Sequence, residues 1–140
     1  MQNFDRSTEF GARADQRLRD DLIGWLTTVG SDGTPQPSPI WFLWDGTEIL
    51  LFSEPNTPRV RNIQRQPKVS LHLNSDEHGG NVVILTGEAR IDEAAPKADT
   101  IEAYRQKYQS GMESIGLSAE AFAKTYSVAI RFSPAKLRGH

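Results

Sequence analysis

Four cations stand close together in the stretch NTPRVRNIQRQPKVSLHL, residues 56–73, and no other part of the chain is as basic. They are Arg59, Arg61, Arg65 and Lys68, directly ahead of an apolar strand pattern. Cations gathered in this way suit the binding of an anion such as a phosphate group. The formal net charge of the whole chain is -2, so the positive charge is local. A general nucleic-acid or membrane-surface binder, which needs a broad positive surface, is therefore not expected.

The residues around these cations predict a short helix with defined ends. Thr57 is a preferred N-cap residue, and Pro58 is favoured at the first helical position. Pro67 forces the residue before it out of the helical conformation. The sequence therefore predicts a helix over residues 58–66.

The start of this helix is the predicted anion site. The backbone N–H groups of Arg59 and Val60 are expected to be free there, next to the side chains of Arg59 and Arg61. A helix is stabilised by acidic residues in its first turn, so arginines at this place oppose the helix dipole unless an anion binds. A solvated basic turn is the alternative explanation, and short motifs of this kind leave it open.

Three prolines alternate in the segment TPQPSPIW. Pro35, Pro37 and Pro39 lack backbone N–H donors, so one edge of this predicted strand cannot form an ordinary hydrogen-bond ladder. The strand is then either an exposed edge protected against aggregation, or a place where Gln36 and Ser38 face a ligand or a second subunit.

Known catalytic motifs are absent from the sequence. It contains no GxGxxG, Walker, GxSxG or HExxH pattern. The lack of cysteine excludes disulfides and thiolate nucleophiles and is typical of a cytoplasmic protein. His72, His78 and His140 do not have metal-ligand spacing, so no metal site is expected. No side chain stands out as a catalytic acid, base or nucleophile, and chemistry in such a protein is usually supplied by a cofactor.

The elements that would position these residues form a mainly β pattern in a single domain, residues 1–140. Residues 22–53 are expected to form three strands in an antiparallel meander with Asp-Gly turns. We expect a flexible segment at 1–13, helices at 14–21, 95–108 and 118–126, and later strands at 68–74, 81–91 and 127–139. Six or seven strands with helices inserted late in the chain predict a closed or split antiparallel β-barrel.

The ordered set of segments 25–53, 57–73, 85–91 and 132–139 resembles the pyridoxamine 5′-phosphate oxidase-like superfamily of FMN-binding split β-barrels. The resemblance is greater to its actinobacterial flavin/deazaflavin oxidoreductase branch, whose members use coenzyme F420. It implies a homodimer with cofactor sites at the subunit interface, the ring between the subunits and the phosphate on the helix after the third strand. The residues that this resemblance assigns to the cofactor are Gln36, Ser38, Trp41, Ser53, Thr57, Pro58, Arg59, Val60, Arg61 and Asn62, with Arg138 as a further candidate.

The sequence also departs from the FMN-using oxidases of the superfamily. It has Thr-Pro-Arg at 57–59 where those members carry a Ser-Arg-Lys cluster, and AKLRGH at its end where they carry Arg-Leu-x-Pro for pyridoxal phosphate. These departures favour F420 over FMN. The resemblance then implies an F420-dependent reductase that transfers hydride to a small unsaturated or quinone-like acceptor. An FMN-binding protein, or a flavin or deazaflavin carrier without turnover, is the alternative.

Overall fold

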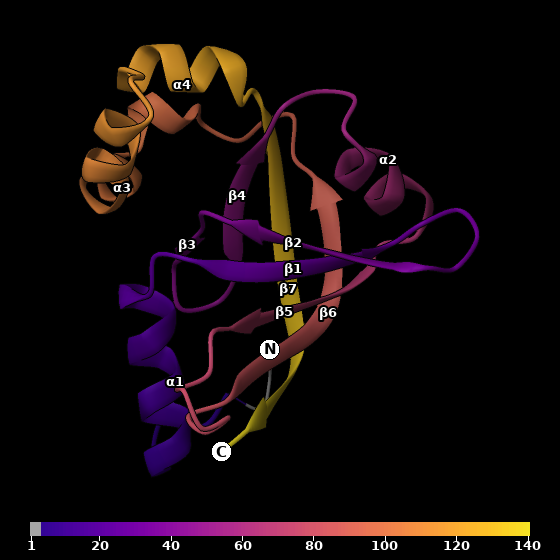
Figure 1. The fold of residues 1–140 in the computed structure, drawn as a ribbon, viewed down its shortest axis with the longest axis vertical. Helices are drawn as coiled ribbons and strands as arrows, with labels where there is room; N and C mark the ends of the chain where they lie inside the picture. Colours follow the sequence, from indigo (N-terminus) through magenta and orange to yellow (C-terminus); the bar gives the residue numbers. More distant parts are fainter. Residues whose placement is uncertain (1–3) are drawn as a thin grey trace.

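A computed structural model describes residues 4–140 of the chain (Figure 1). Residues 1–3, part of the segment predicted to be flexible, lie outside the described residues. The fold is mainly β. Its elements are α1 (Glu9–Asp20), β1 (Gly24–Val29), β2 (Pro35–Ile40), β3 (Leu43–Trp44), β4 (Ile49–Ser53), α2 (Pro58–Arg65), β5 (Lys68–Leu73), β6 (Val83–Ile91), the 3₁₀-helix η1 (Ala98–Thr100), α3 (Glu102–Ser114), α4 (Ala119–Thr125) and β7 (Val128–Gly139).

Seven antiparallel strands form one curled sheet in the order β2-β1-β5-β6-β7-β4-β3. The two edge strands, β2 and β3, are separated in the chain only by Trp41 and Phe42. Because the three residue steps from Ile40 to Leu43 span at most about 11 Å even when extended, the sheet has to curl until its two edges approach each other. The result is the split antiparallel barrel that the sequence predicted.

A bulge where β6 pairs with β7 assists this curling. The register shifts between Thr86 and Gly87, and a β-bulge bends a strand and increases its twist. A Cβ atom at Gly87 would lie 2.2 Å from the carbonyl oxygen of Ser133. Only glycine therefore allows the two strands to approach at this bend.

Strand β2 is an edge strand of the sheet, as both predicted possibilities require. Pro35, Pro37 and Pro39 oppose alternate residues of β1 and are exposed. The residues between them, Gln36 and Ser38, contact helix α2 of the same chain. The prolines leave the outer edge without donors, as expected, while the alternate positions hold the helix.

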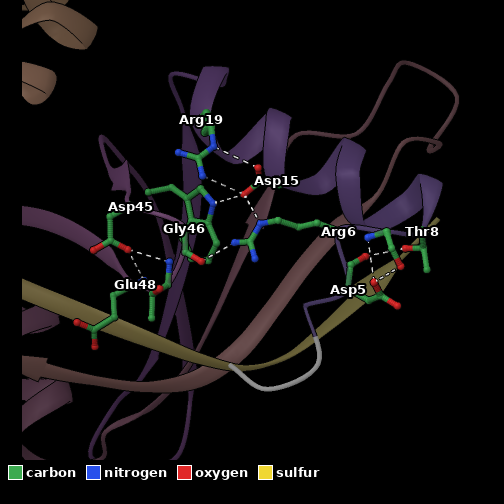
Figure 2. Close-up of polar contacts among 11 residues, drawn as sticks. Asp5, Arg6, Thr8, Asp15, Arg19, Asp45, Gly46 and Glu48 are labelled. Atoms are coloured by element: carbon green, nitrogen blue, oxygen red, sulfur yellow. Dashed lines mark hydrogen bonds and ion pairs between the residues drawn. The ribbon is translucent and has the colours of Figure 1, made fainter.

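Helix α1 is fastened to the β3–β4 hairpin by polar contacts (Figure 2). The carboxylate of Asp15 accepts a hydrogen bond from the Trp44 indole at 2.9 Å and forms ion pairs with Arg6 at 3.1 Å and Arg19 at 3.2 Å. Arg6 also donates to the carbonyl of Gly46 in the hairpin turn. The N-terminal helix is thereby held against one end of the barrel.

Helices α3 and α4 pack together at the upper left of Figure 1 and form a second apolar cluster. The Tyr108 hydroxyl joins this layer to the barrel, since it accepts from the N–H of Phe42 and donates to the carbonyl of Leu22, both at 2.7 Å. Trp41 stacks on Tyr108 with ring centroids 4.8 Å apart. The helical layer therefore rests on the segment between β2 and β3.

Three expectations about the elements were wrong in detail. Helix α1 begins at Glu9, not Ala14, because Thr8 caps it by accepting a hydrogen bond from Gly11 N–H. Residues 22–53 form four strands, and β2 and β3 do not pair as a meander requires. The helix expected over 95–108 is a 3₁₀ turn followed by α3, because Ile101 is extended between them. No helix in residues 4–140 is long and apolar enough to cross a membrane.

Candidate cofactor site

The start of helix α2 has the local structure that the sequence predicted. Thr57 is the N-cap, and its hydroxyl accepts a hydrogen bond from Val60 N–H at 3.3 Å. Pro58 occupies the first turn. Ser53, at the end of β4, is 2% exposed, and its hydroxyl lies 3.1 Å from the hydroxyl of Thr57. Because the cap occupies the N–H of Val60, the expectation that this group is free was wrong.

Arg59 is a half-buried cation that faces the barrel. Its guanidinium donates to the Ser38 hydroxyl on β2 at 2.6 Å. Its Nε is buried and has no hydrogen-bond partner among residues 4–140. Burial lowers the pKa of Arg59, and within the described part of the chain no carboxylate lies at ion-pair distance from it. A buried charge without a counterion is costly, so this site favours an anion.

Asn62 has a different environment, because its side chain is engaged with the protein itself. It is 5% exposed and donates to Thr28 Oγ1 at 3.0 Å and Gln36 Oε1 at 2.7 Å. Its own oxygen accepts from Arg65 at 3.0 Å. Thr28 was not among the predicted site residues. Asn62 thus fixes α2 against β1 and β2. The position of the whole helix, including its first turn, therefore depends on these contacts.

The other cations of the basic stretch are exposed. Arg61 donates to the carbonyl of Asn56, in the loop that enters α2. Arg65 donates to Val29 O and to Asn62, both at 3.0 Å. Lys68 begins β5 and is exposed. Arg61 and Arg65 are four residues apart and so share one side of the helix.

Trp41 lies away from the polar cluster but adjoins a small pocket that Arg59 also lines. This pocket has a volume of about 280 Å³. Of the aromatic residues around it, only Trp41 was predicted to belong to the site, although Tyr104 and Tyr108, four apart on α3, carried the signal for an apolar helix face. The pocket is lined by Pro39, Ile40, Trp41, Phe52, Arg59, Tyr104, Ile115, Phe122 and Tyr126.

Two other regions contribute little to this site within the chain. Arg138 is exposed near the end of β7, and this end lies far from α2 in Figure 1. A larger hollow of about 760 Å³ lies beyond Phe52 and Tyr126 and contains none of the predicted site residues.

Within residues 4–140, no group of three or more histidine or acidic side chains is placed to hold a metal ion.

The comparison with protein families agrees with this architecture. A family described as pyridoxamine 5′-phosphate oxidase matches residues 10–140. The chain belongs to this family. Among solved structures, one named F420 reductase is 25% identical, covers 89% of this chain and 94% of its own, and has a TM-score of 0.68.

Two solved structures with lower sequence identity to this chain show the same fold. A conserved hypothetical protein from Mycobacterium tuberculosis is 22% identical over 94% of this chain and 82% of its own, with a TM-score of 0.71. The heme storage protein HutZ from Vibrio cholerae is 18% identical over 94% of this chain and 92% of its own, with a TM-score of 0.61. Proteins named for different ligands, F420 and heme, thus share this fold, and the fold alone does not determine the ligand.

Proposed function

We propose that this protein is an F420-dependent oxidoreductase that transfers hydride from the reduced deazaflavin to a small unsaturated or quinone-like acceptor. The observation that carries the proposal is the cation at the start of α2, Arg59, which is half-buried without a counterion in the described chain. The similarity to a structure named F420 reductase supports the choice of cofactor.

The residues at the start of α2 fit a phosphate group. The guanidinium of Arg59 has unused donors besides the one bound to Ser38. Arg61, two residues further along the helix, adds a second, exposed guanidinium that donates to the carbonyl of Asn56. The Thr57 hydroxyl, supported by Ser53, caps the helix at the same place. A bound phosphate would neutralise the two arginines and reverse their unfavourable interaction with the helix dipole.

F420 is favoured over FMN because basic residues continue past the first turn. F420 extends beyond its phosphate into a tail of glutamate carboxylates, and Arg61, Arg65 and Lys68 are exposed along this side of the protein. An exposed ion pair between a tail carboxylate and one of these cations contributes less than about 1 kcal/mol and is screened by salt. The tail should therefore add a salt-sensitive part to the affinity, whereas FMN has no tail to gain from these cations.

The protein's part in the reaction would be to bind and orient. The bound cofactor would supply the hydride, because no protein side chain can donate one. Gln36, Ser38 and Thr57 provide amide and hydroxyl groups that can fix the position of a ligand, which accelerates a reaction between bound partners. None of these three groups titrates near neutral pH, so we expect the proton to come from solvent.

We further propose that the active form is a homodimer with the cofactor at the subunit interface. The outer face of β1 and β2 carries the three exposed prolines and Trp25, which stacks on His72 at 6.4 Å between ring centroids. A shallow hollow of about 610 Å³ continues this face and is lined in part by Thr27 and Val29. Aromatic residues are enriched at protein interfaces. Trp25 is half-buried within one chain, and a second copy of the chain could cover its exposed part.

Light scattering at micromolar concentration tests the dimer. We expect twice the mass of 15.6 kDa, and we expect Thr27→Arg, on the outer face, to dissociate the dimer and weaken cofactor binding. Gln64→Arg is the matched control, because Gln64 is exposed on α2 and its substitution adds the same charge elsewhere. A monomer that still binds the cofactor would contradict the interface site.

A carrier without turnover is the second candidate, because the site contains no group suited to act as an acid or base. Turnover separates the two functions. The protein is mixed with reduced F420 and a quinone such as menadione, and the return of the oxidised deazaflavin's fluorescence is followed against a protein-free control. An F420 reductase accelerates this return with multiple turnovers. A carrier binds F420 without accelerating its oxidation, and that result would overturn the proposed activity.

A further inference from the structure

The pocket beside Arg59 combines aromatic walls with an unpaired cation. Its walls come from three parts of the chain: the segment that follows β2, strand β4, and the helices α3 and α4. Trp41 stacks on Phe122 at 5.4 Å, and Phe122 stacks on Tyr126 at 4.5 Å. Flat side chains thus form much of the surface that a ligand would contact.

The cation of this pocket has no anionic partner among the residues that the structure describes. The guanidinium of Arg59 lines the pocket together with apolar and aromatic groups. The Ser38 hydroxyl is its one hydrogen-bond acceptor among residues 4–140, and its buried Nε has none. A charge in apolar surroundings gains most from an ion pair when water is excluded. The pocket therefore offers an apolar slot with one strong recognition point.

We propose that this pocket binds flat aromatic molecules of one or two rings that carry an anionic oxygen group, such as an aryl carboxylate, and that such a ligand competes with a phosphate group for Arg59. The ring lies against the aromatic walls, and the anionic group pairs with Arg59. The volume of about 280 Å³ is at the lower end for small-molecule sites, which limits the ring system to this size. The competition with the cofactor's phosphate rests on the proposed function, but the binding of the anion does not require the cofactor.

Ile115 lines this pocket on its solvent-exposed side. It follows α3, is 50% exposed and lines the pocket, although it is a large apolar residue. An exposed apolar side chain at the opening of an apolar pocket is positioned to be covered when a ligand binds. Because it is exposed, its substitution should leave the fold intact, and this makes it the most useful position for a test.

The test uses 2-naphthoate and its neutral analogue 2-naphthamide, titrated into the protein without cofactor by isothermal titration calorimetry. We expect naphthoate to bind about 10-fold or more tightly than naphthamide, because only the carboxylate forms a charge-assisted pair. Arg59→Gln should reduce naphthoate affinity about 10- to 100-fold and leave naphthamide affinity nearly unchanged. Ile115→Trp should fill the opening and abolish the binding of both.

Arg61→Gln is the matched control for Arg59→Gln, since Arg61 is an exposed cation on the same helix and does not line the pocket. It should leave naphthoate binding unchanged. Equal affinities for naphthoate and naphthamide, or an equal loss in the two arginine variants, would overturn the proposal. So would naphthoate binding that survives Ile115→Trp, or its absence from the wild-type protein.

Separate titration of F420 distinguishes this proposal from the proposed function. F420 binding should weaken in Arg61→Gln and persist in Ile115→Trp, the reverse of the naphthoate result. If F420 does not bind but naphthoate does, with the expected variant pattern, the proposed function fails and the anion pocket stands. If F420 binds and naphthoate does not, the proposed function stands and this inference fails.

Discussion

Replacement of Asn62 by alanine tests how the candidate site is held in place. Asn62 joins α2 to the barrel through Thr28 and Gln36, and it also accepts from Arg65. Gln36 and Arg65 are exposed, so water can replace their lost partner at little cost. Thr28 is 2% exposed and cannot recruit water in this way. The loss therefore comes mainly from one buried polar group.

The magnitude follows from this difference in burial. A buried polar group left without a partner costs about 1–3 kcal/mol, and the better helix propensity of alanine over asparagine returns roughly 0.5 kcal/mol. We expect Asn62→Ala to lower the free energy of unfolding by about 0.5–2.5 kcal/mol. Urea unfolding followed by tryptophan fluorescence measures this change, with an unchanged m-value as the sign that the folded state stays compact.

Gln64→Ala provides the matched control, because Gln64 is an exposed amide on the same helix. Its effect should stay within about 0.5 kcal/mol. A double variant of Asn62→Ala with Thr28→Val should be less destabilised than the sum of the two single variants, since they remove the same hydrogen bond. If Asn62→Ala is no more destabilising than Gln64→Ala, or if the pair is additive, then Asn62 does not anchor the helix.

Three further predictions concern other contacts. Thr57→Ala removes the cap of α2 and should cost about 1 kcal/mol of stability, measured by the same urea titration; no loss would contradict the capping role. Tyr108→Phe removes the hydroxyl that joins α3 to Phe42 and Leu22 and should cost about 1–3 kcal/mol, and an unchanged thermal midpoint would show that the helical layer does not depend on it. Hydrogen bonds from Arg90 and Ser133 lower the pKa of Glu48 to about 2. Because the folded pKa lies below the unfolded pKa, the stability that Glu48 contributes is complete above the ordinary glutamate pKa of about 4.5 and is lost as the pH falls through about 2. Glu48→Gln should flatten the acid limb of a stability-against-pH curve, and an unchanged curve would refute this.

Much of the fold could be predicted because local signals agreed with one another. Thr57, Pro58 and Pro67 defined α2 almost to the residue, and the helix expected over 118–126 is α4, with Ser118 as its N-cap. The strand pairing was harder to predict. The Asp-Gly turns indicated hairpins, but no local signal shows that Trp41 and Phe42 carry the chain from one edge of the sheet to the other.

The candidate site was predicted in part for the same reason. The residues of α2 follow one another in the chain, and the alternation of β2 placed Gln36 and Ser38 on one side, so both sets could be found locally. The contacts of Arg59 with Ser38 and of Asn62 with Thr28 join residues 21 and 34 positions apart. The aromatic pocket depends on the packing of α3 and α4 over Trp41, which periodicity alone does not specify.

The most direct test of the central claim is a side-by-side fluorescence titration of the protein with F420 and with FMN at low and at high salt. The account predicts that F420 binds more tightly than FMN and that the difference narrows at high salt, because the glutamate tail pairs with exposed cations that salt screens. Arg61→Ala should narrow the same difference at low salt. FMN binding that equals or exceeds F420 binding under both conditions would contradict the account and assign the protein to the flavin-using members of its family.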